Sequence, residues 1–271
     1  MYPMKIVTVE EIRRLETLAN EAGHSFPDMM ESAGRATAQA IHHRLGMEDR
    51  CALVLVGPGN NGGDGLVAAH YLKDLGARVV CYIWKRKTAG DPNFQRVAED
   101  NIPIFWAEAD LDLDVLRDLL PSADVVVDAL LGVGVARPIG GILQGILDAV
   151  RQAKAIGMSR QGLIELAPYR SSIPGPLVVA VDCPTGLDCD SGALDPAAVS
   201  ADVTVTFAYP KAGLLRFPGA EAVGDLVVAD IGIPSELAAD VSLEMANPGA
   251  VRAVLPPRPQ WAHKGSVGRS L

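Results

Sequence analysis

The sequence has few cysteines, few aromatic side chains and no surplus of positive charge. Its four cysteines (Cys51, Cys81, Cys183 and Cys189) form no C-x-x-C pair and join no histidine cluster, which argues against a zinc site and for reduced thiols. Acidic residues outnumber basic ones by 33 to 24, giving a formal net charge of −9. Proteins that bind nucleic acids usually carry a basic face, so this balance argues against that class.

Long hydrophobic runs are also missing. No apolar stretch approaches the roughly 18 residues that a membrane-spanning helix needs. The N-terminal stretch MYPMKIVTVEE lacks the basic and then apolar regions of a signal peptide, so we expect a cytoplasmic protein. Hydrophobic residues make up 49% of the 271 positions and charged residues 21%, which is enough for a substantial core.

Alternating helical and strand patterns predict an α/β fold. A capping box of Thr8 and Glu11 opens a helix over 9–21, and Ser25 caps a second helix over 27–45. Further strands are expected at 51–56, 78–84, 103–106, 125–128, 177–182, 203–207 and 226–229, and further helices at 66–75, 91–99, 113–120 and 142–155. This order predicts a three-layer αβα sandwich with a Rossmann-like, mostly parallel sheet and N-terminal helices.

Two segments interrupt this alternation. Residues 156–176 contain two prolines and a polar cluster between a helix and a strand, and are longer than a typical connection. We interpret them as a flap or an insertion. The proline-rich stretch 256–262 is typical of a linker, because prolines prevent regular structure there.

The most informative motif is GPGNNGGDG at 57–65, which lies between the strand at 51–56 and the next helix. Gly57, Gly59 and Gly62 satisfy G-x-G-x-x-G, a weak pattern by itself. Glycines let the backbone turn sharply, and a helix N-terminus then presents free N–H groups to an anion. The motif therefore indicates a phosphate-binding turn.

The same motif departs from the ordinary dinucleotide fingerprint. That fingerprint needs an acid at the end of the second strand to bind the ribose, whereas this strand ends in WKRK at 84–87. Asn60, Asn61 and Asp64 instead add two amides and a carboxylate, which can hydrogen-bond a ligand or coordinate a hard cation. The alternative is a glycine turn whose polar side chains only cap the helix.

Two further buried strands end in an aspartate. In the stretch 125–138, Asp128 is the last residue of the expected strand. In the stretch 178–192, Asp182 is the last residue of the expected strand, and Thr185 follows in the turn. Either aspartate alone could be a helix cap. Ligands of open α/β sheets bind at the carboxyl ends of the strands, so these groups are expected to converge with the glycine turn on one rim of the sheet.

Lys211 follows the strand expected at 203–207. A lysine at a strand end can meet a phosphate or a carboxylate at the same rim. It can equally be a solvated side chain in a turn, and the sequence leaves both interpretations open.

Together these strings resemble the YjeF N-terminal family, the NAD(P)HX epimerases. The resemblance covers about 5–255, and GPGNNGGDG is highly specific to the family. It implies a Rossmann-like αβα sandwich that commonly forms a homodimer. It also implies an isomerase of nicotinamide nucleotide repair, which interconverts the R and S forms of NADHX and NADPHX, the hydrates of NADH and NADPH.

The resemblance also assigns residues to the site. It implies two substrate loops, formed by Asn60, Asn61, Gly62, Gly63 and Asp64 and by Gly132, Val133, Gly134, Val135, Ala136, Arg137 and Pro138. Asn61, Asp128 and Thr185 match positions that bind a potassium ion. Asp182 matches a substrate-contacting residue that we expect to be the catalytic acid.

Three features qualify the match. The family usually has isoleucine and serine where this chain has Cys183 and Thr185, and threonine keeps the hydroxyl. The segment 156–176 has no counterpart in the family pattern. The tail after His263 resembles the start of an ADP- or ATP-dependent NAD(P)HX dehydratase domain, so we expect an epimerase domain over 1–255, followed by a linker and a truncated dehydratase start over 256–271.

Three functions remain to be weighed. The first is an epimerase in which Asp182 acts as general acid and then base at the hemiaminal-like carbon. The second is a non-catalytic nucleotide-binding or dimerisation module, which the three aspartates Asp64, Asp128 and Asp182 disfavour. The third is an ordinary NADP-dependent dehydrogenase in which Lys85, Arg86 and Lys87 bind a 2′-phosphate. That function leaves the asparagines of the glycine motif unexplained.

Overall fold

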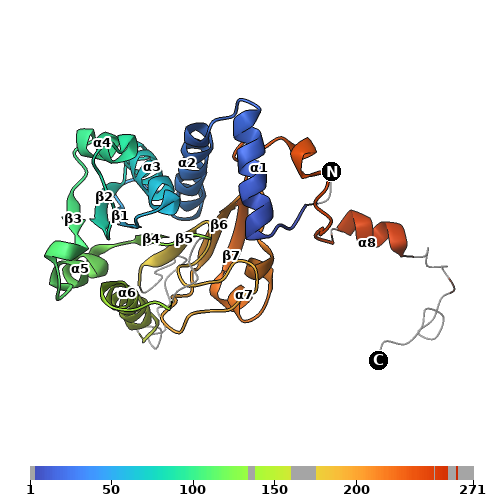
Figure 1. Ribbon diagram of the computed structural model, residues 1–271. Coiled ribbons are helices and arrows are strands. Elements are labelled where there is room, and N and C mark those ends of the chain that lie inside the picture. The colour runs from blue at the N-terminus through green and yellow to red at the C-terminus, as the bar shows by residue number, and fades with distance from the viewer. Residues whose placement is uncertain (1–3, 134–137, 160–174, 247, 256–260, 262–271) are drawn as a thin grey trace.

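The computed structural model describes residues 4–133, 138–159, 175–246, 248–255 and 261. Within these residues a single sheet has the strand order β3-β2-β1-β4-β5-β6-β7, and all neighbouring strands run parallel (Figure 1). The strands are β1 Cys51–Val56, β2 Arg78–Ile83, β3 Ile104–Trp106, β4 Val125–Ala129, β5 Leu177–Val181, β6 Val203–Phe207 and β7 Asp225–Ala229. The α-helices are α1 Val9–Glu21, α2 Phe26–Leu45, α3 Asn60–Asp74, α4 Pro92–Glu99, α5 Asp114–Leu119, α6 Ile142–Ser159, α7 Gly219–Ala222 and α8 Pro248–Val254.

Most of the predicted elements are confirmed, including both N-terminal caps. Thr8 and Glu11 form the capping box of α1, and the Ser25 side chain accepts a hydrogen bond at the start of α2. One helix start is wrong: α3 begins at Asn60, whereas the sequence predicted a start near Leu66. The glycines of the motif disfavour a helix by propensity, but packing against the sheet and α2 overrides that weak preference.

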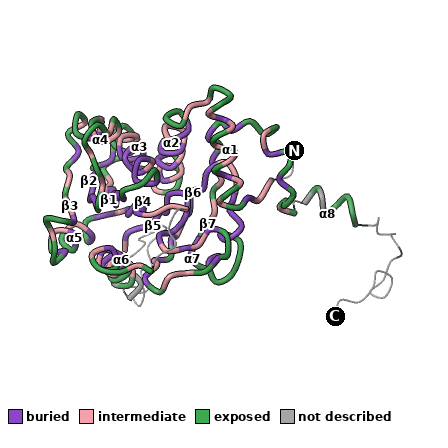
Figure 2. The backbone as a smooth tube through the Cα atoms, in the orientation of Figure 1, coloured by how far each residue is buried: buried purple, intermediate pink, exposed green. Residues whose placement is uncertain are grey.

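The sheet separates two hydrophobic cores, because successive strand residues point to opposite faces. Val54 and Val56 of β1 pack with residues of α1, α2 and α3, whereas Leu53 and Leu55 pack with residues of α5 and α6. Figure 1 shows α1 to α4 on one side of the sheet and α5 to α7 on the other. Figure 2 shows that the buried backbone concentrates in the central strands, as a sheet covered on both faces requires.

The strand order reverses between β1 and β4, which are hydrogen-bonded neighbours at the centre of the sheet. The connection from β1 leads away to β2, and the connection from β4 leads the other way to β5. The loops after β1 and β4 lie at this switch point, and open α/β sheets bind their ligands there, outside the carboxyl ends of the strands. This position brings the glycine motif and Asp128 to the same rim.

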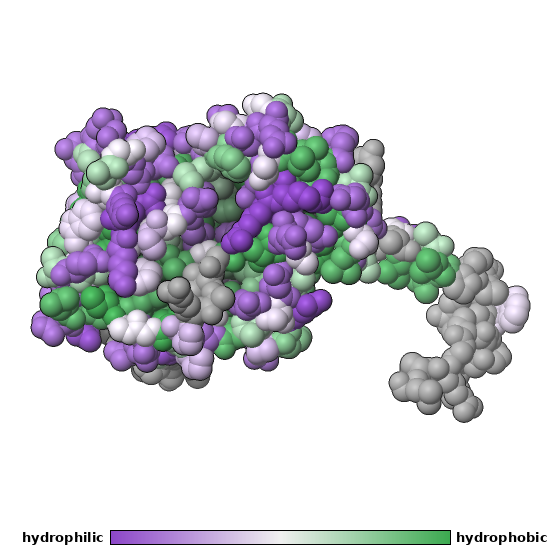
Figure 3. Space-filling model, viewed as in Figure 1, coloured by the Kyte–Doolittle hydropathy of each residue, from purple (hydrophilic) through white to green (hydrophobic). Residues whose placement is uncertain are grey.

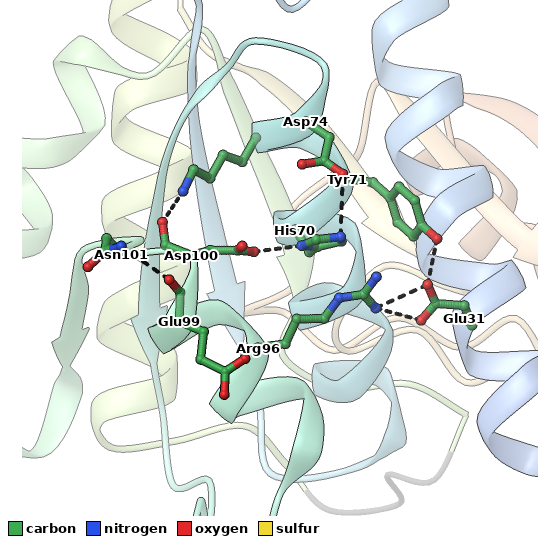
Figure 4. A network of polar contacts seen from close by, with 9 residues as sticks. Glu31, His70, Tyr71, Asp74, Arg96, Glu99, Asp100 and Asn101 are labelled. Atoms are coloured by element: carbon green, nitrogen blue, oxygen red, sulfur yellow. Dashed lines mark hydrogen bonds and ion pairs between the residues drawn. The ribbon is translucent and has the colours of Figure 1, made fainter.

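A polar network joins α2, α3 and α4 on their outer surface (Figure 4). Arg96 donates to both oxygens of Glu31 at 3.0 and 2.8 Å, and the Tyr71 hydroxyl donates to Glu31 at 2.5 Å. Nδ1 of His70 lies 2.6 Å from a carboxylate oxygen of Asp100. Partly exposed ion pairs such as these contribute only about 0.2–1 kcal/mol each. These contacts link the helices that carry and flank the glycine motif.

α8 was not expected from the sequence, which predicted only a linker shortly after it. It projects from the body of the molecule, and Figure 3 shows apolar side chains along this projection. Val251, Val254 and Leu255 are exposed there. None of the helices within the described ranges is long and apolar enough to cross a membrane. The linker stretch 256–260, the tail 262–271 and most of the 156–176 segment lie outside the described residues.

Gly57 is required by close packing where β1 meets β4. A Cβ atom at this position would overlap the carbonyl oxygen of Leu130, whereas a Cβ at Gly59 would meet no atom of the described residues within 4 Å. We expect Gly57→Ala to lower the free energy of unfolding by about 1–3 kcal/mol, because backbone must shift to admit the methyl group. Gly59→Ala is the matched control and should cost less than about 1 kcal/mol. Urea unfolding of both variants measures the difference, and equal losses would contradict the packing argument.

Candidate functional site

The amide of Asn61 is buried and has no partner among the residues that the structure describes. Asn61 lies in the first turn of α3 with 7% of its surface exposed, and within the described ranges neither its amide oxygen nor its amide nitrogen has a hydrogen-bond partner. A Cβ built on Gly132 would lie 3.4 Å from the amide oxygen, so this side chain faces the loop after β4. Burying an unpaired amide costs free energy, and such a group in a native fold points to a ligand or an ion.

Asp128 and Thr185 join the ends of β4 and β5. The Thr185 hydroxyl donates to one oxygen of Asp128 at 2.7 Å, and the Thr185 backbone N–H donates to the other at 2.9 Å. The hydroxyl also accepts from the Leu131 N–H at 3.1 Å. Burial raises the pKa of Asp128, and the hydrogen bonds from Thr185 oppose that rise. The loops that carry Asn61, Asp128 and Thr185 thus meet at one rim, and the ion-binding role of these residues stays a prediction.

Asp182 lies in a strained turn at the end of β5. Its φ is +64°, and the Cys183 N–H donates across it to the Val181 carbonyl at 2.8 Å. A three-residue turn with a positive φ at a residue other than glycine is a rare and strained conformation. The surrounding hydrogen bonds stabilise it here, and it turns the carboxylate toward β6. Strain of this kind is concentrated at functional sites.

Lys211 forms a buried ion pair with Asp182. Lys211 Nζ contacts Asp182 Oδ1 and donates to Thr206 Oγ1 at 3.0 Å. The Thr206 hydroxyl itself donates to the same Asp182 oxygen at 3.2 Å. Burial alone would lower the pKa of Lys211, but the charge and hydrogen bond of Asp182 outweigh it and raise that pKa. Of the two interpretations left open by the sequence, contact with a carboxylate is confirmed.

The N-terminal segment covers Lys211 and explains its burial, because Val7 forms a parallel bridge with Lys211. The Val7 N–H donates to the Pro210 carbonyl at 3.0 Å, and the Ala212 N–H donates to the Val7 carbonyl at 2.9 Å. Lys211 is therefore only 1% exposed. A solvated lysine, the other interpretation, is wrong because this distant segment closes over the turn.

Two more carboxyl groups influence the pair electrostatically. Burial raises the pKa of Asp64 well above its usual range, and the charges of Asp182 and Glu16 raise it further. Burial also raises the pKa of Glu16, which the charge of Lys211 opposes. Sequence reasoning missed Glu16 and Thr206. The available signals were a glutamate beside the buried residues Ile12 and Leu15 of α1, and a threonine inside a buried strand.

The loop after β4 is only partly described. Gly132 lies against Asn61, Val133 packs against a small cluster around Cys183, and Pro138 is exposed. The other four predicted loop residues, Gly134, Val135, Ala136 and Arg137, lie outside the described residues. All four cysteines are free thiols. The pKa of Cys183 is raised by a hydrogen bond with Cys189 and by burial, which disfavours a thiolate nucleophile beside Asp182.

Comparison with known proteins places this arrangement in context. A bifunctional NAD(P)H-hydrate repair enzyme Nnr of Thermofilum pendens is 36% identical over 99% of this chain and 47% of its own length. An NAD(P)H-hydrate epimerase of Clavibacter michiganensis subsp. michiganensis is 36% identical over 82% of this chain and 88% of its own length. The chain spans about half the length of the bifunctional relatives that it matches.

The fold is also known from a crystal structure. A yeast protein superposes with a TM-score of 0.70 at 23% identity, over 89% of this chain and 95% of the yeast chain. The family model described as YjeF-related protein N-terminus matches residues 27–213, a range that includes the glycine motif, Asp128, Asp182 and Lys211. The chain therefore belongs to the YjeF-related protein N-terminus family.

Proposed function

We propose that this chain is an isomerase that interconverts the R and S forms of hydrated NADH and NADPH, and so serves nicotinamide nucleotide repair. The observation that carries the proposal is the buried Asp182–Lys211 pair at the carboxyl end of β5, on the same rim as the glycine motif. The Clavibacter relative, of which this chain covers 88%, is named NAD(P)H-hydrate epimerase, and its name supports the same reaction.

The chemistry needs a proton delivered to or taken from oxygen, and the reverse transfer when the centre re-forms. The hydrated carbon carries a hydroxyl and a ring nitrogen, so it can lose its configuration by ring opening or by departure of water. Asp182 Oδ1 is engaged by Lys211 and Thr206, and no donor in the described part of the chain reaches Oδ2. Oδ2 is therefore the atom that we assign to proton transfer, which typically contributes about 10²–10⁴-fold to a rate.

The glycine motif supports binding of the dinucleotide. Gly59 precedes α3 and gives it no side-chain cap, so the first N–H groups of the helix have no side-chain acceptor there. A helix N-terminus of this kind attracts an anion through its N–H groups and its dipole. We assign the pyrophosphate of the substrate to this position, with the nicotinamide end directed toward Asp182.

We further infer that Asn61, Asp128 and Thr185 would hold a potassium ion. The unpartnered amide oxygen of Asn61, the buried carboxylate of Asp128 and the hydroxyl of Thr185 are all oxygen donors, which suit a hard cation. When bound, the ion would supply a positive charge that ties the three loops together. We also expect a homodimer in the cytoplasm, and a dehydratase domain as the partner domain in a longer protein.

Potassium should stabilise the folded chain. A ligand that binds only the folded state adds about 2.7 kcal/mol at about 100 times its Kd. We expect a higher Tm in potassium chloride than in tetramethylammonium chloride of equal ionic strength, and we expect Asn61→Ala to reduce that difference. Equal Tm values in the two salts for the wild-type chain would contradict the potassium site.

A direct assay separates the three functions weighed above. Pure S-NADHX incubated with the chain should yield the R form well above the spontaneous rate, as followed by chromatography. A binding module would bind the dinucleotide without accelerating this exchange. A dehydrogenase would instead oxidise NADPH in the presence of a carbonyl substrate. Exchange at the spontaneous rate would contradict the proposed function.

A further inference from the structure

Arg86 lies shortly after β2 and contacts the backbone of the glycine motif. Its Nη1 donates to the carbonyl oxygen of Gly57 at 3.1 Å and to that of Gly59 at 2.8 Å. Only 10% of its side chain is exposed, whereas the neighbouring Lys85 and Lys87 are both exposed. The guanidinium is therefore already bound to backbone of this chain, unlike the two lysines beside it.

Asp91 fixes the same guanidinium from the other side. Arg86 Nε donates to Asp91 Oδ2 at 2.7 Å, and the Asp91 side chain is 11% exposed. The other oxygen of Asp91 caps α4 by accepting from Asn93 N at 3.1 Å and Phe94 N at 3.3 Å. A charged, mostly buried pair anchored at a helix start has little freedom, so Arg86 is a rigid link between α4 and the glycine motif.

The Gly59 carbonyl also accepts from the Gly63 N–H of α3 at 3.3 Å, so Arg86 and the helix together set the direction of the backbone in the motif. The peptide bond is planar and trans, so an N–H points away from the carbonyl of its own peptide group. Because the Gly59 carbonyl points at Arg86, the N–H of Asn60 points away from it, toward the rim where an anion would lie. Asn60 is the first residue of α3, and its N–H has no partner within the helix.

The guanidinium of Arg86 also packs against two further glycines of the motif. A Cβ built on Gly62 would lie 2.1 Å from the Gly57 carbonyl oxygen and 2.8 Å from Arg86 Nη1. One built on Gly63 would lie 2.7 Å from Met30 Sδ and 3.5 Å from Arg86 Nη2. Any side chain at Gly62 would therefore push the guanidinium away from the turn. The glycines and the arginine form one packed unit.

We propose that Arg86 is a positioning residue that holds the glycine turn open for a pyrophosphate, and is not a group that binds a 2′-phosphate. This inference rests on one part of the proposed function, namely that the turn binds a dinucleotide. It replaces the role that Arg86 would have in an ordinary NADP-dependent dehydrogenase. The pyrophosphate is common to both dinucleotides, whereas only NADP carries the 2′-phosphate, so the two roles predict different selectivity.

The test compares the affinity of the full chain for NAD⁺ and for NADP⁺ by calorimetry. We expect Arg86→Met to lower the affinity for both dinucleotides equally, by about tenfold, because loss of the charge-assisted contact deforms the phosphate turn that both share. Arg86→Lys should restore part of the affinity for both, because an ammonium can reach one carbonyl but cannot form the planar fork. Lys85→Met and Lys87→Met are the matched controls and should leave the affinity for NAD⁺ unchanged.

The outcomes separate the inference from the proposed function. If Arg86→Met lowers the affinity for NADP⁺ alone, the positioning role is overturned and the 2′-phosphate is assigned to Arg86. Unchanged affinity for both dinucleotides would overturn it as well, as would an Arg86→Lys variant that binds no better than Arg86→Met. A wild-type chain that binds both dinucleotides but leaves R- and S-NADHX unequilibrated would contradict the epimerase only.

Discussion

Asp182→Asn should lower the epimerisation rate by about 10²–10⁴-fold, the range that general acid–base catalysis typically contributes. The amide keeps the size of the side chain and can still accept a hydrogen bond from Thr206, but it cannot carry a proton to or from the substrate. The measurement is chromatographic exchange of R- and S-NADHX under saturating substrate. Substrate affinity should change much less than the rate, because the pyrophosphate contacts lie elsewhere.

The same substitution has a cost to stability that the sequence alone did not indicate. It leaves the buried Lys211 cation without its counter-charge, which typically destabilises a protein by about 3–5 kcal/mol. The double variant Asp182→Asn with Lys211→Met removes both charges and should recover much of that loss without recovering activity. An Asp182→Asn variant that turns over at the wild-type rate would contradict the assignment and leave Asp64 as the next candidate acid.

Lys211→Met should destabilise the fold about as much as Asp182→Asn does. It leaves the Asp182 carboxylate buried without a partner, and we expect a loss of about 3–5 kcal/mol in the free energy of unfolding at neutral pH. The rate should also fall, because Lys211 and Thr206 orient the carboxylate. Urea unfolding at pH 7 measures the effect, and a loss below about 1 kcal/mol would show that the pair contributes little net stability.

The pH dependence of this loss has a definite sign. The pKa of Lys211 is raised in the folded chain, so the charged lysine stabilises the fold fully below its ordinary pKa of about 10.4. This contribution falls as the pH rises through the raised pKa. The stability difference between wild type and Lys211→Met should therefore be constant from about pH 7 to pH 9 and shrink above about pH 10.4. A difference that shrinks between pH 7 and pH 9 would contradict the raised pKa.

Local signals in the sequence were enough to predict most of the fold. The capping box of Thr8 and Glu11 and the buried strand at Cys51–Val56 depend on neighbouring residues alone, and both were predicted correctly. Asp128 and Asp182 were found because the carboxyl ends of parallel strands share one rim. The start of α3 was misplaced, because the glycines of the motif disfavour a helix until the sheet packs against them.

The rest depends on contacts between distant segments. The burial of Lys211 requires Val7, which lies far away in the chain, so no local pattern predicts it. Arg86 occupies the position of a phosphate-binding residue, and only the carbonyls of Gly57 and Gly59 reveal its different partner. Glu16 faces the site because α1 packs beside it, which its helical pattern alone cannot indicate.

A crystal structure of the chain with a bound nicotinamide dinucleotide would show whether the nicotinamide ring reaches Asp182. We expect the pyrophosphate at the N–H groups that follow Gly59, and the nicotinamide ring with its reacting carbon beside Asp182 Oδ2. The substituent oxygen of a hydrated ring should lie within hydrogen-bond distance of that atom, about 2.5–3.0 Å. A ring bound away from Asp182, with the pyrophosphate in the turn, would contradict the assignment of Asp182 as the acid and base of the epimerisation.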